Sequence, residues 1–231
     1  MIFLIFAGII GFAIGRVISL VIGSLFLQKR NVISSTARTL IVLGSGGKQS
    51  KTINPQNKIP TNTALFILGH TTEMLEIVKK LNFQKYTPRL YVVAENDQNS
   101  VDKLLAIEKG KSDYKIYPIT RSRNVKQSYV SSIKTTIIAI MKCIPLVFHL
   151  KPDLILCNGP STCIPICFVS YVFKIFYINY NCKIAFIESF CRVKSVSLSG
   201  KMLLYFTDIF VVQWPKISKI SKKVLYFGRL T

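Results

Sequence analysis

The sequence predicts an α/β protein with a Rossmann-like parallel sheet covered by helices on both faces, preceded by an N-terminal transmembrane helix. Three observations support this fold class. Short β-rich runs alternate with longer helical stretches, the strand runs are apolar almost throughout, and residues 1–27 contain a single charged side chain, Arg16. Strands that are apolar on both sides are typical of a parallel sheet buried between helices. A chain of 231 residues has room for one such domain and an appendage.

Residues 1–27 are expected to form a transmembrane anchor. At about 1.5 Å per residue, a helix of this length crosses the roughly 30 Å hydrocarbon layer. A cleaved signal peptide is the alternative, but no basic residue precedes the apolar run and no small-residue cleavage site is evident. The linker at 28–38 is basic, and positive residues stay on the cytoplasmic side. The domain at 39–231 is therefore expected to face the cytosol.

The first half of this domain is predicted to contain three strand–helix units. The strands are expected at 39–44, 89–95 and 113–119, and the helices at 70–81, 97–108 and 128–150. The second of these helices begins at an acidic cap, Asp97, and the third contains Pro145, where a bend is expected. A basic loop at 121–127 precedes the third helix.

The second half continues the alternation without an internal repeat. Strands are expected at 153–160, 183–189 and 209–214, and helices at 162–177 and 198–207. Residues 162–178 resemble a membrane span in composition, but they connect two strands of one sheet, so a buried or membrane-surface helix is predicted. The segment 130–149 combines Lys134 and Lys142 with many apolar neighbours, which is typical of a helix at a membrane interface.

The formal charge of +21 indicates an anionic partner, either nucleic acid or phospholipid. Nucleic-acid binding is not expected, because no reader motif is present. No cofactor is expected either, because the dinucleotide fingerprint lacks its third glycine and its acidic residue. Without a C-x-x-C pair or a histidine nearby in sequence, the cysteines predict buried structural thiols and no metal site. These cysteines are Cys143, Cys157, Cys163, Cys167, Cys182 and Cys191.

Three turns after predicted strands could bind a ligand. The turn Gly44-Ser45-Gly46-Gly47 offers free N–H groups, and its glycines let a diphosphate approach the positive end of the next helix. A second turn, Asn158-Gly159-Pro160-Ser161-Thr162, also precedes a helix, and Glu188-Ser189 ends the following strand. Carboxyl ends of parallel strands share one edge of the sheet, so one ligand site is expected there. Simple helix capping by Ser161 and Thr162 is the alternative.

Five segments, in this order, closely resemble one family. They are GSGG (44–47), HTTEML (70–75), NGPSTC (158–163), AFIESFCRVKSVSLSGKMLLYFTD (185–208) and FVVQW (210–214). The family is that of the membrane-bound subunit of the UDP-N-acetylglucosamine transferase of dolichol-linked oligosaccharide synthesis, asparagine-linked glycosylation protein fourteen. The resemblance extends over nearly the whole chain.

The resemblance implies that the domain is the acceptor-binding half of a GT-B glycosyltransferase. The N-terminal helix would hold it, as a single-pass protein, on the cytosolic face of the endoplasmic reticulum membrane. A separate soluble subunit would bind the nucleotide sugar. The two would transfer N-acetylglucosamine to N-acetylglucosaminyl-diphosphodolichol, and this chain alone is expected to be inactive. The competing hypothesis is a basic membrane-attached scaffold without substrate binding.

The resemblance also suggests roles for particular residues. Gly44, Gly46, Gly47 and His70 correspond to a GxGGH motif, in which the imidazole either helps to deprotonate the acceptor hydroxyl or contacts phosphate. A plain helix-start residue is the alternative for His70. Glu188 is expected to bind sugar hydroxyls or to orient its turn. Residues 224–231 correspond to the segment that docks the soluble partner, with an ordinary final strand as the alternative.

One departure from the family pattern affects the expected site. The family continues from GSGG directly to the histidine, whereas residues 48–69 separate the two here. An inserted loop is tolerated because closure entropy grows slowly with length, but it would draw the glycine turn away from the helix. Alternatively, residues 64–69 replace the first strand. We favour a retained intron. Codons for Gly47-Lys48 can contain GTAAA, as at the start of an intron, and codons for residues 66–69 can contain TTAG, as at its end. Removing the nucleotides between these points keeps the reading frame.

Overall fold

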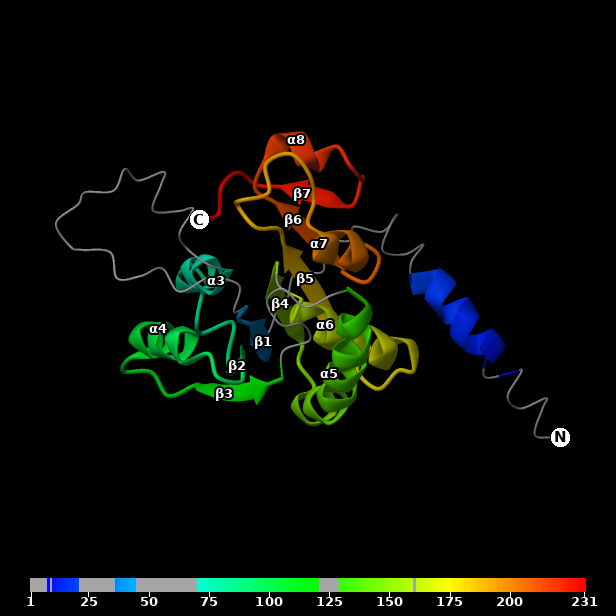
Figure 1. Ribbon diagram of the computed structural model, residues 1–231. Helices are drawn as coiled ribbons and strands as arrows, with labels where there is room; N and C mark the ends of the chain where they lie inside the picture. Colours follow the sequence, from blue (N-terminus) through cyan, green and yellow to red (C-terminus); the bar gives the residue numbers. More distant parts are fainter. Residues whose placement is uncertain (1–7, 9, 21–35, 45–69, 121–128, 160) are drawn as a thin grey trace.

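The computed structural model describes residues 8, 10–20, 36–44, 70–120, 129–159 and 161–231 (Figure 1). Several predicted features therefore lie outside the described residues. They are most of the linker, the turn residues Ser45, Gly46 and Gly47, the interval 48–69, the basic loop and Pro160. Of the predicted anchor, the description covers the helix Ile10–Leu20 and Gly8.

Seven parallel strands form one sheet in the order β3-β2-β1-β4-β5-β6-β7. Their bounds are β1 Thr39–Val42, β2 Arg89–Ala94, β3 Tyr114–Ile119, β4 Leu154–Asn158, β5 Lys183–Ile187, β6 Ile209–Val212 and β7 Val224–Tyr226. The six predicted strands are confirmed, and β7 adds a short edge strand. The segment 39–42 occupies the first-strand position, between β2 and β4.

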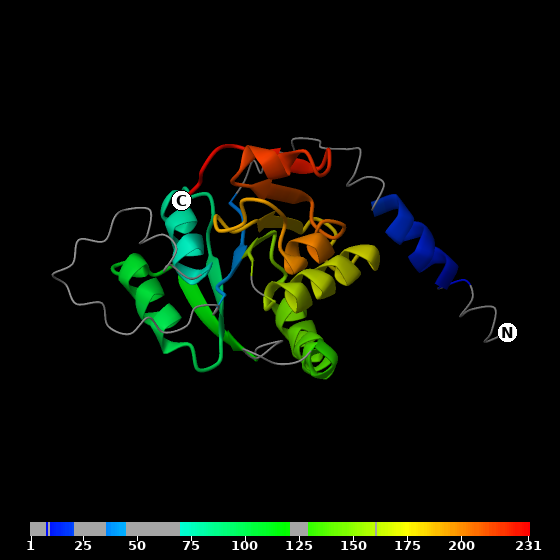
Figure 2. The ribbon, with the colours of Figure 1, turned by 45° about the horizontal axis from the view of Figure 1, so that its top comes forward.

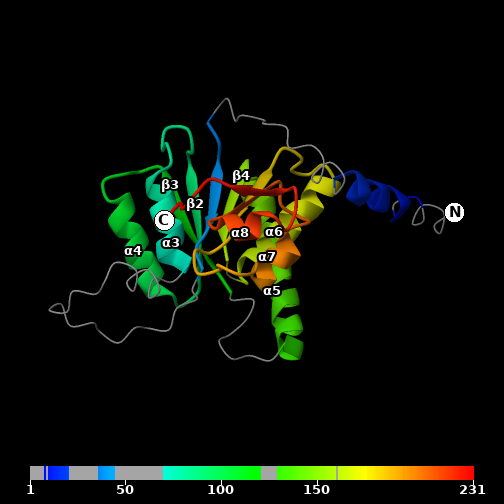
Figure 3. The ribbon, with the colours of Figure 1, turned by 90° about the horizontal axis from the view of Figure 1, so that it is seen from above.

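Helices cover both faces of this sheet, as predicted (Figures 1 and 3). Side chains alternate along β1, so Leu40 and Val42 pack on one layer of helices while Ile41 and Leu43 pack on the other. The first layer contains α5 (Tyr129–Leu150), α6 (Cys163–Ile175) and α7 (Leu198–Leu203); the second contains α3 (His70–Lys79) and α4 (Gln98–Glu108). A four-residue helix, α8 (Pro215–Ser218), was not predicted.

The strand order reverses between β1 and β4. The chain builds outward from β1 to β3, returns through the long helix α5, and then builds outward again from β4 to β7. Helices that follow β1 and β4 therefore leave toward opposite faces of the sheet (Figure 2). In open α/β sheets, ligands bind outside the carboxyl ends of the strands at such a reversal.

The two apolar helices differ in burial. Most residues of α6 are buried between the sheet and its neighbours, which confirms the predicted buried helix. By contrast, α5 contains the segment Ser132–Leu150, which among the described residues is the one helix long and apolar enough to cross a membrane, and which is 22% buried. The predicted helix at 198–207 is shorter in the structure: α7 ends at Leu203, and a turn in which Thr207 N–H donates to the Leu203 carbonyl leads to β6.

Candidate functional site

The carboxyl edge at the β1/β4 reversal brings the first helix start next to the end of β1. The Thr71 hydroxyl donates a hydrogen bond to the Gly44 carbonyl at 2.7 Å and lies 2.8 Å from Ser100 Oγ. The described residues on either side of the interval 45–69 therefore lie close together. The expectation that an insertion draws the glycine turn away from this helix is wrong for Gly44, the part of the turn that the structure describes.

His70 begins α3 and points toward the end of β4. Its side chain is 30% exposed, and Nδ1 lies 3.0 Å from Asn158 Oδ1. Because a carboxamide oxygen only accepts hydrogen bonds, Nδ1 carries the hydrogen. In the neutral ring the lone pair then resides on Nε2. This arrangement leaves His70 with one nitrogen that can accept a proton from a bound molecule.

Gly159 gives the imidazole its space. A Cβ at this position would lie 2.4 Å from Cε1 and 2.5 Å from Nδ1 of His70, well inside van der Waals contact. The backbone of Gly159 also has φ +66°, in the left-handed region that favours glycine. Both the backbone conformation and the position of the His70 ring thus require glycine here.

Asn158 presents an unused donor at this edge. The residue is 1% exposed, and Nδ2 has no hydrogen-bond partner within the described part of the chain. Leaving a buried donor unpaired costs about 1–3 kcal/mol, so an acceptor oxygen from a ligand would stabilise this site. Asn158 also follows the strand position that pairs with β1, which places it beside Gly44 and His70.

The residues after Asn158 lead into α6. Thr162 is buried at the N-cap position, but its side chain makes no capping hydrogen bond there. The half-buried Ser161 contributes its carbonyl, which accepts from Ile164 N–H at 3.1 Å. Side-chain capping, the alternative considered for these two residues, is therefore absent at Thr162 in the described structure.

Glu73, whose sequence context does not single it out, accepts more hydrogen bonds than the other described carboxylates near the site. It lies in the first turn of α3 with its side chain 8% exposed. Its Oε2 accepts from Ser189 Oγ at 2.9 Å and lies 3.9 Å from His70 Nδ1. Its Oε1 accepts from Phe190 N–H and, at 2.7 Å, from Gln213 Nε2.

Glu188 lies at the same edge as Asn158, as predicted. Asn158 pairs with Ile187 in the β4–β5 register, so Glu188 follows directly on the neighbouring strand. Its side chain is fully buried and accepts from Ser189 N–H at 3.0 Å and Ser197 N–H at 2.8 Å. Burial raises the pKa of Glu188, although the backbone donors oppose the shift. This geometry fits the turn-orienting role better than contact with a sugar.

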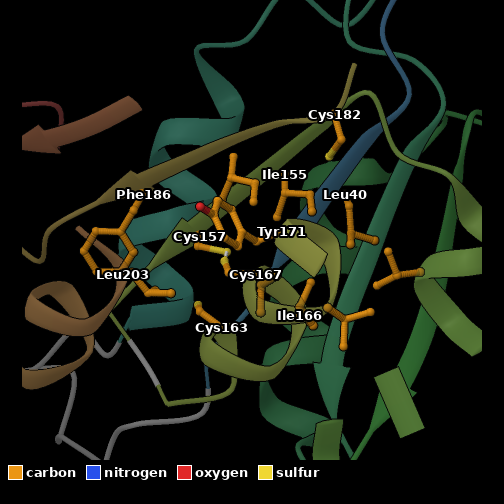
Figure 4. Close-up of a cluster of buried hydrophobic side chains, with 14 of the residues drawn as sticks. Leu40, Ile155, Cys157, Cys163, Ile166, Cys167, Tyr171, Cys182, Phe186 and Leu203 are labelled. Carbon is orange, nitrogen blue, oxygen red and sulfur yellow. Dashed lines mark hydrogen bonds between the residues drawn. The ribbon is translucent and has the colours of Figure 1, made fainter. Parts of the chain in front are cut away.

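Five of the six cysteines are buried, as predicted, whereas Cys191 is exposed, so the prediction of a buried thiol is wrong for that residue. Cys157 Sγ lies 3.4 Å from Cys167 Sγ, and Cys163 is buried beside them (Figure 4). Burial raises the pKa of Cys157 and, to about 12, the pKa values of Cys143 and Cys182, so these thiols stay protonated. Within the described ranges, no group of three or more His, Cys, Asp or Glu side chains is arranged to hold a metal.

Two connected residues at this edge, Glu73 and Gln213, were missed because their sequence signals are weak. A carboxylate in the first turn of a helix is common, since it favours the positive helix end. A glutamine that directly follows a strand, as in FVVQW, is less common, and burial of such an amide implies a specific partner. The identity of that partner, 140 positions away, could not be read from the pattern.

The fold defines a class of protein. A parallel sheet with a central strand reversal and helices on both faces is a Rossmann-like domain. MurG of Acinetobacter baumannii has this fold with a TM-score of 0.55 and 12% sequence identity, over 82% of this chain and 45% of that chain.

Sequence comparisons identify the family. The family model described as oligosaccharide biosynthesis protein Alg14 like matches residues 65–230. The UDP-N-acetylglucosamine transferase subunit ALG14 of Mus musculus is 36% identical, over 86% of this chain and 97% of that protein. Its counterpart in Rattus norvegicus is 42% identical over 70% of this chain and 78% of that protein. The counterpart in Schizosaccharomyces pombe is 41% identical over 69% of this chain and 78% of that protein. The chain belongs to the Alg14 family.

Proposed function

We propose that this chain is the acceptor-binding, membrane-anchoring subunit of a heteromeric UDP-N-acetylglucosamine transferase. It adds the second N-acetylglucosamine to N-acetylglucosaminyl-diphosphodolichol on the cytosolic face of the endoplasmic reticulum, together with a soluble subunit that binds the nucleotide sugar. The family membership gives the general activity its support. The observation that carries the acceptor role is the His70–Asn158–Gly159 cluster at the sheet reversal.

The cluster supplies two functions that such an acceptor needs. The α3 N-terminus and the unpaired Asn158 Nδ2 offer N–H donors to the diphosphate, and the preceding glycine turn adds its backbone N–H groups. His70 Nε2 accepts the proton of the attacking sugar hydroxyl while that oxygen bonds to the anomeric carbon of the donor and UDP departs. Asn158 Oδ1 holds the imidazole in the required tautomer.

Two helices support attachment to the bilayer. Ile10–Leu20 is an apolar N-terminal helix within the predicted anchor. The outward face of α5 exposes a stripe of large apolar side chains, and the helix contains no acidic residue. An apolar stripe with lysines at its sides suits a helix lying in the headgroup region of an anionic membrane. The stripe consists of Ile133, Ile137, Met141, Ile144 and Phe148, each at least 41% exposed.

The end of the chain supports docking of a soluble partner. Leu225 and Tyr226 belong to the edge strand β7, and Phe227 is 67% exposed beside them. Arg229 lies over the rings of Phe190 at 5.3 Å and Trp214 at 4.8 Å. An exposed aromatic next to an open sheet edge is a surface on which a second protein can pack.

Transfer assays test the proposal directly. The detergent-solubilised chain, the soluble partner, UDP-N-acetylglucosamine and a phytanyl-diphosphate-linked N-acetylglucosamine acceptor should yield product only when both proteins are present. Absence of product with both proteins would favour the membrane-attached scaffold. Asn158→Asp retains an oxygen that faces His70 but replaces the amide donor with a charged acceptor. Loss of the donor and repulsion between the new carboxylate and the diphosphate should together raise the acceptor KM at least about 10-fold and leave the donor-sugar KM unchanged.

A further inference from the structure

Buried polar groups connect the C-terminus of the chain to His70. Gln213 follows β6 directly and is 1% exposed. Its Oε1 accepts from Leu230 N–H and from Thr231 Oγ1, both at 3.1 Å. Its Nε2 donates to Glu73 Oε1 at 2.7 Å. One carboxamide thus contacts the last two residues of the chain and a carboxylate of the site at the same time.

The chemistry of the amide gives this contact a direction. A carboxamide has an acceptor end and a donor end, and two donors of the C-terminal residues face its oxygen. Because the oxygen faces the terminus, the NH₂ group must face Glu73. The same NH₂ group also donates to the Glu188 carbonyl at 3.2 Å, so the seated terminus fixes the rotation of the whole amide.

The terminal residues rest on the elements that hold Glu73. Lys80 follows α3 directly and donates from Nζ to the Leu230 carbonyl at 2.6 Å. Arg229 stacks on Phe190, whose backbone N–H donates to Glu73. Movement of residues 229–231 would therefore change the contacts of the helix that carries Glu73 and of Phe190, whose N–H donates to the Glu73 carboxylate.

Two acceptors compete for the one hydrogen on His70 Nδ1. Asn158 Oδ1 is 3.0 Å away and holds it, while Glu73 Oε2 is 3.9 Å away, beyond hydrogen-bond distance. A buried carboxylate that loses one hydrogen-bond donor is stabilised by contact with another donor. The His70 imidazole lies one helical turn before Glu73, so a small side-chain rotation would bring the two together. Gln213 is one of three donors, with Ser189 and Phe190, that hold Glu73 away from His70, and it is the one that contacts the C-terminal residues.

We infer that Glu73 and Gln213 are positioning residues that couple the seating of the C-terminal residues to the orientation of His70. With Leu230 and Thr231 seated, Gln213 retains Glu73, and His70 stays on Asn158 with Nε2 available for the acceptor. With the terminus displaced, Glu73 turns to His70 and pulls the ring from that position. This inference rests on the proposed function only in taking His70 as the acceptor-site base.

Kinetics of the full heteromer at saturating soluble partner test the coupling. Gln213→Leu removes both ends of the amide and should lower kcat about 10-fold, a part of what a general base contributes, with the acceptor KM within twofold of wild type. Glu73→Gln keeps the side-chain shape without the charge, and its kcat is the reference for the double variant. The double variant Glu73→Gln/Gln213→Leu should have the kcat of Glu73→Gln and exceed that of Gln213→Leu, because no carboxylate remains to capture His70.

A matched control separates coupling from general loss of an amide. Asn179→Leu removes a carboxamide at the opposite edge of the sheet, where Nδ2 donates to the Pro152 carbonyl at 2.9 Å. Its kcat should equal that of wild type. A double variant as impaired as Gln213→Leu, or a Gln213→Leu enzyme with unchanged kcat, would overturn the inference.

A second readout does not depend on transfer activity. The chain has two histidines, His70 and the exposed His149, so selective ¹⁵N-histidine labelling of the solubilised full chain gives one internal reference. The Gln213→Leu change should shift the Nδ1 signal of His70, because its hydrogen-bond acceptor changes from an amide to a carboxylate oxygen, and the added Glu73→Gln change should reverse the shift. Unmoved His70 signals would refute the coupling even if transfer proceeds, and moved signals without any transfer would refute only the proposed function.

Discussion

Gly159→Ala offers a sharp test of the acceptor site. The new Cβ would lie 2.4 Å from His70 Cε1, whereas carbon atoms normally rest about 3.5–4.0 Å apart, so the ring has to move by about 1 Å. That movement breaks the 3.0 Å contact between His70 Nδ1 and Asn158 Oδ1. Displacement of a catalytic group by about 1 Å costs about 100-fold in rate, and we expect a loss of that size in kcat.

The same substitution also strains the backbone, which calls for a control. A side chain in the left-handed region costs about 1–2 kcal/mol. Gly110 has φ +78°, and no neighbouring atom lies within 4 Å of the position that a Cβ would occupy, so Gly110→Ala carries the strain without the clash. Gly159→Ala should lose at least as much thermal stability in detergent as Gly110→Ala, and only Gly159→Ala should lose transfer activity. Equal kcat in the two variants would show that the position of the His70 ring is irrelevant to catalysis.

Three further predictions concern other parts of the chain. Deleting residues 48–69, the proposed retained intron, should preserve folding and transfer activity. It should raise the free energy of unfolding by about 2 kcal/mol, because the connection between Gly44 and His70 shortens about eightfold. A mature transcript that keeps these codons would refute the intron. Brominated lipids in vesicles should quench the fluorescence of a Met141→Trp variant on α5 but not that of a Leu105→Trp variant on α4, although both native side chains are exposed. Equal quenching of the two variants would contradict an interfacial α5. Burial lowers the pKa of Lys223 to about 8, so as the pH rises the folded state releases this proton before the unfolded state does. The free energy of unfolding, measured by denaturant titration relative to Lys223→Met, should therefore rise by about 2 kcal/mol between pH 8 and 9.5. A difference that stays constant over this range would contradict the lowered pKa.

The sequence predicted the parts of the site that turn chemistry controls. His70 begins a helix and Asn158 ends a strand that leads into the next helix, and the carboxyl ends of parallel strands meet at one edge. Their convergence was therefore predictable from the alternation of elements. Glu188 was predicted at the right edge, but its complete burial was not, because that burial depends on the turn at Ser197 folding back over it.

Partners far apart along the chain could not be predicted in this way. Glu73 and Gln213 lie 140 positions apart and meet because β6 stands next to β5 and α3 packs over the same edge. The register of β6 and the course of the last residues then decide which donor faces which oxygen. Hydrophobic periodicity carries no information about such choices.

The sequence by itself determined the α/β alternation, the apolar strands, the basic charge and the turns that can bind an anion. These properties are local, since they follow from side-chain period and from backbone preferences of a few neighbouring residues. Only the tertiary structure decided that β1 and β4 are neighbours, that Gly159 makes room for the His70 ring, and that Gln213 connects the C-terminus to Glu73. The physical reason is that strand order and the packing of helices over the sheet set these distances, and both are properties of the whole chain.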